Sequence, residues 1–309
     1  MKTTGLPFAF FEGKITPIEK AQVSIMTNAL QYGTGIFGGM RGYFNKEKNE
    51  LNVFRMDDHL TRFLSSLKIL GVEIEYTQKD LKKIFLDLIQ QNKPEKDVYF
   101  RPFAYAGSLN LAPDLDRDNV FSFALYMVPL GDYLPTNKGL SVGVSSWRRI
   151  SDNAIPSRAK ISGGYINSAL AKKEAHNSGY DEAIFLNEAG HVAEGSAMNI
   201  FLVRNGKVIT PSVTEDILEG ITRRSVMEIA TDLGYEVIER VIDRSELYVS
   251  DEVFFSGTAA QVAWISQVEG RIIGDGNQGE VSKKIQEMFF NTVRGKDKKY
   301  SSWLTTVKI

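Results

Sequence analysis

The sequence predicts an α+β fold in which strands and helices are grouped instead of strictly alternating. Two amphipathic helical patterns stand next to each other in the first third of the chain, and this grouping argues against a doubly wound sheet. With 309 residues the chain is long enough for about two domains, each with its own core. Runs rich in β-branched and aromatic residues predict strands at 98–106, 120–128, 140–147, 182–186, 198–204, 236–242 and 252–256.

Three helices are expected from apolar residues that recur at helical spacing. The first covers 57–70, where Leu60, Phe63, Leu64 and Leu67 form one stripe behind Asp57 as the N-cap. The second covers 78–91, with an apolar stripe of Leu81, Ile84, Phe85, Leu88 and Ile89. The third begins near Ile221 and runs to about Leu233. We expect the first two stripes to face a core.

The domain boundary is expected in the segment 129–139, PLGDYLPTNKG. Its two prolines and two glycines lie between two strand patterns and can continue neither strand. The sequence therefore predicts a small N-terminal α+β domain at 1–128, an interdomain loop at 129–139 and a large C-terminal domain at 140–309.

Composition and charge exclude several classes of partner. The chain carries 37 Lys and Arg against 38 Asp and Glu, so it has no overall basic field for nucleic acid or anionic membranes. It has no cysteine, no apolar run as long as a membrane span, and only a short N-terminal apolar patch interrupted by Pro7. We expect a cytoplasmic protein. His59, His176 and His191 are scattered without the pairing typical of a metal site, so no metal is expected.

Gly33, Gly35 and Gly38 match the dinucleotide-binding fingerprint as GTGIFG. That fingerprint needs a strand before it and a helix after it, whereas GMRGYF and LNVFR after these glycines predict a hairpin. This context argues against the alternative of an oxidoreductase that binds a nicotinamide cofactor.

Four other segments place polar groups where chemistry is possible. Lys160 lies between a proline-containing turn and a Gly-Gly step, and a desolvated lysine amine is a nucleophile. Glu194 follows a predicted hairpin turn. Gly220, Ile221 and Thr222 open a predicted helix, whose first N–H groups can bind an anion. In FFSGTAA, a strand ends at Gly257 before Thr258 and Ala259. Taken singly, each segment also fits an ordinary turn, cap or surface residue.

Taken together and in this order, the segments resemble the class IV aminotransferases, fold-type IV enzymes that use pyridoxal 5'-phosphate and share a fold with D-amino acid aminotransferase. The closest likeness is to the branched-chain amino acid aminotransferases. It covers nearly the whole chain, through NALQYGTGIFGGMRGY, VFRMDDHLTRF, YFRP, SSWRR, IPSRAK, GYDEAIFLNEAG, VAEGS, LEGITR and DEVFFSGTAA.

The resemblance implies a role for each matching cofactor residue. Lys160 would bind the cofactor aldehyde and then move the proton of the substrate α-carbon. Glu194 would pair with the pyridine nitrogen, and Tyr165 would donate a hydrogen bond to the ring oxygen. The phosphate would be held by Arg55, Gly220, Ile221, Thr222 and Thr258.

The resemblance also implies the substrate site. Tyr99 and the amides of Thr258 and Ala259 would bind the α-carboxylate, while Arg101 and Tyr32 would accept the distal carboxylate of glutamate. In the family Tyr32 comes from the neighbouring subunit, which implies a homodimer or a larger homo-oligomer. The apolar part of the pocket is expected to come from Gly38, Phe37, Tyr133, Trp147 and Met198.

Three positions depart from the family pattern: Gly38 stands where glutamate is usual, Gly164 where asparagine is usual, and Met198 in a segment that is usually GEN. Gly38 motivates the hypothesis of a wider pocket. The expected reaction is transamination of L-leucine, L-isoleucine or L-valine with 2-oxoglutarate by a ping-pong cycle. The alternatives within the fold are a D-amino acid transaminase, an (R)-amine transaminase and aminodeoxychorismate lyase.

Overall fold

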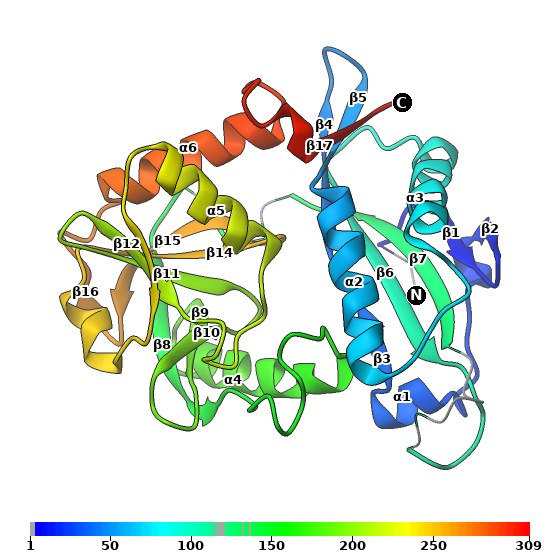
Figure 1. The fold of residues 1–309 in the computed structure, drawn as a ribbon, viewed down its shortest axis with the longest axis horizontal. Helices are drawn as coiled ribbons and strands as arrows, with labels where there is room; N and C mark the ends of the chain where they lie inside the picture. Colours follow the sequence, from blue (N-terminus) through cyan, green and yellow to red (C-terminus); the bar gives the residue numbers. More distant parts are fainter. Residues whose placement is uncertain (1–3, 114, 116–120, 132, 136) are drawn as a thin grey trace. The chain divides into compact units, whose positions relative to one another are not determined.

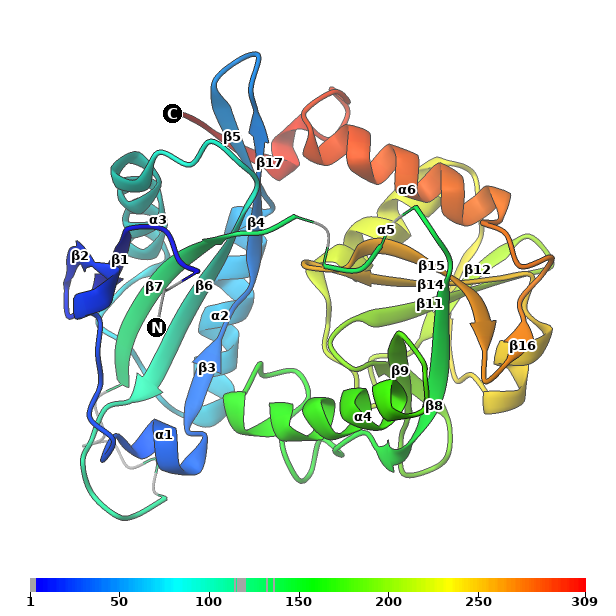
Figure 2. The ribbon, with the colours of Figure 1, turned by 180° about the vertical axis from the view of Figure 1, so that it is seen from behind.

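The computed structural model describes residues 4–113, 115, 121–131, 133–135 and 137–309, and Figures 1 and 2 label its elements from two sides. The chain forms two compact units. The first is Met1–Gly131 with Ala159–Gly163 and Thr292–Ile309, and the second is Asp132–Arg158 with Gly164–Asn291. Each unit is built on its own sheet with helices packed against it, so the predicted α+β class is confirmed.

The sheet of the first unit has the strand order β17-β5-β4-β6-β7-β1-β2, with β3 paired to β6. All its pairs are antiparallel. Its strands are β1 (Phe8–Phe11), β2 (Lys14–Pro17), β3 (Gly35–Phe37), β4 (Met40–Asn45), β5 (Glu50–Phe54), β6 (Val98–Ala106), β7 (Phe121–Pro129) and β17 (Leu304–Lys308). The predicted strand at 120–128 corresponds to β7, except that Val120 lies outside the described residues.

The helices of the first unit are α1 (Asn28–Tyr32), α2 (Met56–Leu70) and α3 (Gln78–Asn92). The predicted stripes of α2 and α3 face the first core, in which Leu60, Phe85 and Leu88 are fully buried. Asp57 is not the N-cap of α2 as predicted. The cap is Arg55, in the left-handed region at φ 46°, and Asp57 lies in the first turn, where its charge favours the positive helix end.

The segment GTGIFG runs from the C-cap of α1, Gly33, into strand β3. It lacks the strand–turn–helix arrangement that a dinucleotide needs. The structure thus supports the rejection of the nicotinamide reading.

The sheet of the second unit is mixed, with the order β10-β9-β8-β15-β14-β11-β12-β13 and with β16 beside β15. In it β8 runs parallel to both β9 and β15, and β12 runs parallel to β13. Its strands are β8 (Leu140–Arg148), β9 (Glu182–Leu186), β10 (Val192–Gly195), β11 (Asn199–Arg204), β12 (Lys207–Pro211), β13 (Val237–Arg240), β14 (Glu252–Gly257), β15 (Gln261–Val268) and β16 (Arg271–Ile272). Helix α4 (Tyr165–Asn177) packs on β8 and β9, α5 (Ile221–Asp232) packs on β14, and α6 (Glu280–Val293) follows the sheet (Figure 2).

The register of this sheet brings several turns to one end. Because β15 runs parallel to β8, with Ile265 opposite Leu140, the turn before β15 lies at the end where β8 begins. That turn contains Thr258 and Ala259, and β9 also begins at this end. Strand β11 begins there too, since Asn199 lies opposite Ser256 near the end of β14.

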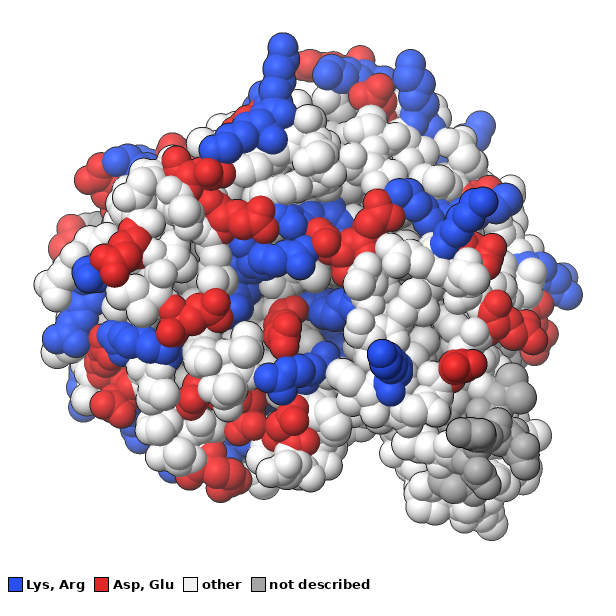
Figure 3. Space-filling model, in the orientation of Figure 1, with Lys and Arg blue, Asp and Glu red and all other residues white. Residues whose placement is uncertain are grey.

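The sequence-based boundary at 129–139 contains the first passage of the chain from one unit to the other, at Gly131 and Asp132. The chain also returns to the first unit at Ala159–Gly163 and at Thr292–Ile309. The sequence-based division into 1–128 and 140–309 places both of these segments in the C-terminal domain instead. Acidic and basic side chains are interspersed over the visible face of both units (Figure 3). Among the described residues, no helix has the length and apolar character needed to cross a membrane.

Candidate active site

One face of strand β6 carries two of the residues expected to bind substrate, Tyr99 and Arg101. Side chains alternate along a strand, so Tyr99, Arg101 and Phe103 share one face while Phe100 faces the core. The Arg101 guanidinium lies 4.6 Å from the ring centre of Phe37 and 5.3 Å from that of Tyr99. Its buried Nε has no hydrogen-bond partner among the described residues. A cation held between two rings in this way can accept a carboxylate.

Lys160 lies beside the same ring. Its Nζ is 5.1 Å from the ring centre of Phe37, and its carbonyl accepts a hydrogen bond of 3.0 Å from the N–H of Phe37. The segment Ala159–Gly163 is attached to the first unit by further bonds, including 2.9 Å from the Ser162 hydroxyl to the carbonyl of Gly33. Gly33 lets two backbones meet near Lys160, since a Cβ on Gly33 would lie 2.6 Å from the Cα of Gly163.

The two glycines that follow Phe37 face opposite sides of the sheet. A Cβ on Gly39 would lie 1.8 Å from the hydroxyl oxygen of Tyr99, so this position must be glycine for Tyr99 to stay where it is. A Cβ on Gly38 would instead lie 2.6 Å from Cγ of Pro102. Pro102 alternates with Arg101 along β6, so the missing side chain at Gly38 does not itself open space beside Tyr99 or Arg101.

Arg55 is held at the start of α2. Its guanidinium lies 3.7 Å from the ring centre of Trp303, and its Nη1 is 3.2 Å from a carboxylate oxygen of Asp58. The backbone N–H of Arg55 also donates to the carbonyl of Trp303 at 2.6 Å. The side chain is almost fully buried. Stacking on a ring fixes the plane of the guanidinium and leaves the group suited to binding a phosphate.

Glu194 is buried at the end of β10 among groups that stabilise its charge. Its Oε1 is 3.0 Å from Nε of Arg149. Its Oε2 accepts hydrogen bonds of 3.1 Å from the side-chain amide of Asn199 and 3.3 Å from the N–H of Leu218. These donors favour the ionised carboxylate, the form that can pair with a protonated ring nitrogen.

Helix α5 begins beside Asn199 without a side-chain cap. Its N-cap is Gly220, and a Cβ there would lie 2.0 Å from Oδ1 of Asn199. The first N–H groups of the helix, near the buried Thr222, therefore form an anion-binding end. Ser256, opposite Asn199 on β14, is fully buried, and its hydroxyl has no hydrogen-bond partner among the described residues. These donors fit a bound phosphate group.

The other predicted residues fall into different surroundings. Tyr165 begins α4 and is half-buried, and Tyr32 ends α1 and is 39% exposed. Met198 is buried in the second core, while Trp147 near the end of β8 is 46% exposed. Tyr133 binds Lys172 of α4 at 2.6 Å.

The three histidines lie in separate surroundings. His59 is buried in α2, the His176 ring lies 3.1 Å from the carbonyl of Asp181, and the His191 ring lies 3.3 Å from Glu215. Within the described residues no three His, Asp or Glu side chains are grouped in a way that could hold a metal ion.

Sequence reasoning did not find Gly39, Arg149, Asn199, Ser256 or Trp303. Gly39, Arg149 and Trp303 contact expected site residues from segments far apart in the chain, whereas Asn199 lies only five residues from its partner Glu194. Arg149 belongs to SSWRR, which the resemblance contains, but nothing in that motif indicates that its partner is Glu194.

Comparison with known proteins gives a consistent result. The family model described as amino-transferase class IV matches residues 35–268. A probable branched-chain-amino-acid aminotransferase of Aquifex aeolicus is 49% identical over 308 residues, which cover 99% of each chain. The branched-chain-amino-acid aminotransferase of Escherichia coli K12 is 35% identical over 310 residues, again 99% of each chain.

Solved structures agree with these relatives. The branched-chain aminotransferase of Thermoproteus uzoniensis, crystallised with norvaline, is 41% identical and superposes with a TM-score of 0.93 over 98% of this chain and 99% of that one. The branched-chain amino acid aminotransferase of Thermobaculum terrenum, in its PLP-bound holo form, is 36% identical with a TM-score of 0.94 over 99% and 100% of the two chains.

Proposed function

Because the chain belongs to the class IV aminotransferases, and within them to the branched-chain-amino-acid aminotransferases, we propose that it transfers the amino group of L-leucine, L-isoleucine or L-valine to 2-oxoglutarate. It is a transferase with pyridoxal 5'-phosphate as cofactor. The products are the branched 2-oxo acid and L-glutamate, formed in two half-reactions that share one site. The site must therefore admit both an apolar chain and a carboxylate.

Arg101 carries this proposal. Its buried Nε has no hydrogen-bond partner among the described residues, and its guanidinium lies against the rings of Phe37 and Tyr99. An unpaired buried donor is costly, so a carboxylate that reaches it gains a charge-assisted hydrogen bond. The same rings offer an apolar surface to a branched side chain. One pocket can thus serve both substrates.

The cofactor supplies an electron sink for the α-carbon of the substrate. Lys160 would hold the cofactor through its amine and would move the proton at the substrate α-carbon. Glu194, which contacts Arg149 and Asn199, would pair with the ring nitrogen of the cofactor. Tyr165 donates to the ring oxygen.

The phosphate site draws on several donor groups. Arg55 provides its guanidinium, and the first turn of α5 at Gly220, Ile221 and Thr222 provides backbone N–H groups. Thr258 provides its hydroxyl.

Substrate recognition uses Tyr99 and the amides of Thr258 and Ala259 for the α-carboxylate. Tyr99 is supported in this role because Gly39 leaves room for its hydroxyl. Tyr133 contributes one wall of the pocket.

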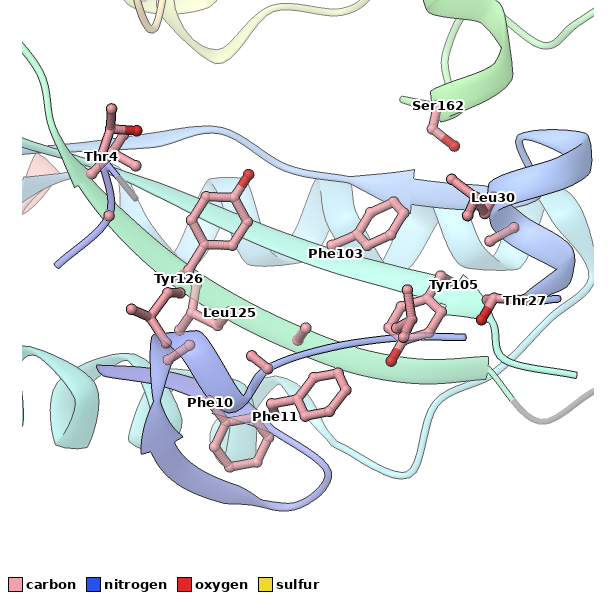
Figure 4. Close-up of a pocket in the computed structure, with 18 of the residues that line it drawn as sticks. Thr4, Phe10, Phe11, Thr27, Leu30, Phe103, Tyr105, Leu125, Tyr126 and Ser162 are labelled. Carbon is pink, nitrogen blue, oxygen red and sulfur yellow. The ribbon is translucent and has the colours of Figure 1, made fainter. Parts of the chain in front are cut away.

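A homodimer is part of the proposal. Five large apolar side chains are exposed in α1 and the segment before it: Val23, Ile25, Met26, Leu30 and Tyr32. Next to α1 lies an apolar cavity of about 540 Å³, lined by side chains of β1, β6, β7 and α1 (Figure 4). Patches of this kind on soluble proteins are typical of interaction surfaces. Tyr32 would then serve the partner's site. A cytoplasmic location fits the absence of cysteine.

The test is a visible spectrum of the purified protein and of Lys160→Ala, each with L-leucine and, separately, with D-alanine. We expect a yellow parent protein that bleaches with L-leucine and a variant that does not. If the parent bleached with D-alanine alone, the assignment of L-amino acids as substrates would be wrong. If it stayed colourless after addition of pyridoxal phosphate, the assignment of the cofactor-binding residues would be wrong. Sedimentation of the parent and of Ile25→Asp with Leu30→Asp tests the dimer, which the double variant should dissociate.

A further inference from the structure

Tyr133 lies on the connection that leads into β8. Its neighbour Leu134 is buried in the second core, while Tyr133 itself is 43% exposed. The register of the sheet puts the start of β8 at the same end as the turn with Thr258 and Ala259. Tyr133 thus lies near the end of the second sheet that carries Thr258 and Ala259. The proposed function assigns the substrate carboxylate to this end.

Lys172 of α4 binds this tyrosine. Its Nζ donates a hydrogen bond of 2.6 Å to the Tyr133 hydroxyl, and the same ammonium lies 4.6 Å from the centre of the ring. This charge-assisted hydrogen bond restricts the position of the ring.

The ammonium is itself held by a buried carboxylate. Nζ of Lys172 is 3.2 Å from Oε2 of Glu182, whose side chain is completely buried at the start of β9. The other oxygen accepts a hydrogen bond of 2.8 Å from the N–H of Ala183. Burial acts against the charged form of Lys172, but the bond to Tyr133 and the charge of Glu182 outweigh it, so the pKa of the lysine is raised. The lysine is therefore charged at neutral pH.

We propose that Lys172 is a positioning residue for the substrate pocket: fixed by Glu182, its ammonium holds Tyr133 in the place from which the ring contacts the substrate. The inference rests on the proposed function, because that function gives Tyr133 its role. Glu182 accounts for the position of the ammonium, since a buried carboxylate needs a nearby cation. Lys172 in turn accounts for the orientation of an exposed ring.

The test compares four variants with the parent. Lys172→Met combined with Glu182→Gln removes the ammonium without leaving a buried charge, and Tyr133→Phe removes only the hydroxyl. Lys172→Arg keeps a cation at this position, so its KM and its cleavage rate should stay closer to those of the parent. Lys173→Met, at the exposed neighbour on the same helix, is the matched control.

We expect KM for L-leucine to rise about fivefold in the double variant and in Tyr133→Phe, with kcat within about twofold, because the lost contact binds substrate and transition state alike. We also expect trypsin to cut after the exposed Lys138 about tenfold faster in the double variant, since the connection is less restrained. Lys173→Met should change neither quantity.

Equal KM values in parent, double variant and Tyr133→Phe would overturn the proposal, as would equal cleavage after Lys138. The cleavage assay needs no substrate. If the parent does not convert L-leucine, the proposed function fails, and the cleavage rates still decide whether Lys172 restrains this connection.

Discussion

At the scale of single residues, Gly39 shows how an absent side chain can set a site. A methyl group there would lie 1.8 Å from the hydroxyl oxygen of Tyr99 and would displace the ring. We expect Gly39→Ala to raise KM for L-leucine about tenfold or more, through the misplaced tyrosine. Steady-state kinetics measure this effect.

Gly38→Ala supplies the comparison on the other face of the sheet. Its methyl group would lie 2.6 Å from Cγ of the rigid Pro102 ring, so the free energy of unfolding should fall by about 1–3 kcal/mol through overpacking. Urea unfolding measures this loss. If Gly38→Ala raised KM and Gly39→Ala did not, our assignment of the two faces of β6 would be contradicted.

Arg149 is the residue whose removal should isolate Glu194. Arg149→Met removes the ion pair but leaves Asn199 and the N–H of Leu218 on the carboxylate. We therefore expect a loss of about 2–3 kcal/mol of unfolding free energy, below the full cost of an unpaired buried charge. The control is Arg158→Met, whose ion pairs with Glu219 and Asp152 are much more exposed and should contribute at most about 1 kcal/mol. A similar small loss in both variants would contradict the proposed support of Glu194.

The site residues proposed from the sequence are those that stand in short motifs. Lys160, Glu194 and Arg55 stand in such motifs, whereas Arg149 and Trp303 act on Glu194 and Arg55 from distant segments. Local pattern contains no information on such pairs. Gly38 and Gly39 show the same limit, because only strand pairing decides which glycine faces Tyr99.

At the scale of elements, one carboxylate on α4 ties that helix to β8. Glu174 accepts hydrogen bonds from the hydroxyl of Ser145 and from the N–H of Ser146 at 3.0 Å. Burial alone would raise the pKa of Glu174, but these bonds outweigh it and hold the pKa below its usual value. A lowered pKa means that the folded state favours the carboxylate. Its contribution to stability is full above the unfolded pKa and is lost as the pH falls through the folded pKa.

Glu174→Gln should therefore reduce the amount of stability that the protein loses as the pH falls. We expect the urea midpoint of the variant to fall less than that of the parent between pH 6 and pH 3. Glu188→Gln, at an exposed position in the turn after β9, is the control and should follow the parent. If the urea midpoints of Glu174→Gln and the parent fell equally with pH, the contact between Glu174 and β8 would not depend on the charge of Glu174.

Elements with a strong period were predictable from sequence, and those defined by pairing were not. The stripes of α2 and α3 and the β-branched runs of β6, β9 and β14 correspond closely to the observed bounds. Strand β17 was not predicted, although LTTVK suits a strand, because only its partner β5, some 250 residues earlier, defines it as one. The N-cap of α2 was misassigned because Arg55 adopts a left-handed backbone that its residue type does not favour.

At the scale of the whole molecule, the chain builds the first unit from three separate stretches. The sequence offered the loop at 129–139 as a boundary because prolines and glycines are visible there. It offered no comparable signal for Ala159–Gly163 or for Thr292–Ile309. Lys160 consequently belongs to the first unit, whereas Glu194 belongs to the second. Composition could not reveal this division, since it follows from backbone bonds such as that between Phe37 and Lys160.

The C-terminal stretch is where this architecture is most open to test. Ending the chain after Tyr300 removes β17, which pairs with β5 over five residues, and also removes Trp303, on which Arg55 stacks. The buried Val307 and one edge of the sheet are lost with it. We expect the first unit to unfold at a temperature roughly 5–10 °C lower, which corresponds to a loss of about 2–3 kcal/mol for a unit of this size, while the second unit unfolds as before. Calorimetry would resolve the two transitions. Trp303→Leu keeps β17 but removes a ring that contacts Arg55, Phe54 and Tyr300, so it should weaken pyridoxal phosphate binding and lower the first transition less than the truncation does. If the truncated chain kept the thermal profile of the parent, β17 would not be an integral strand of the first sheet.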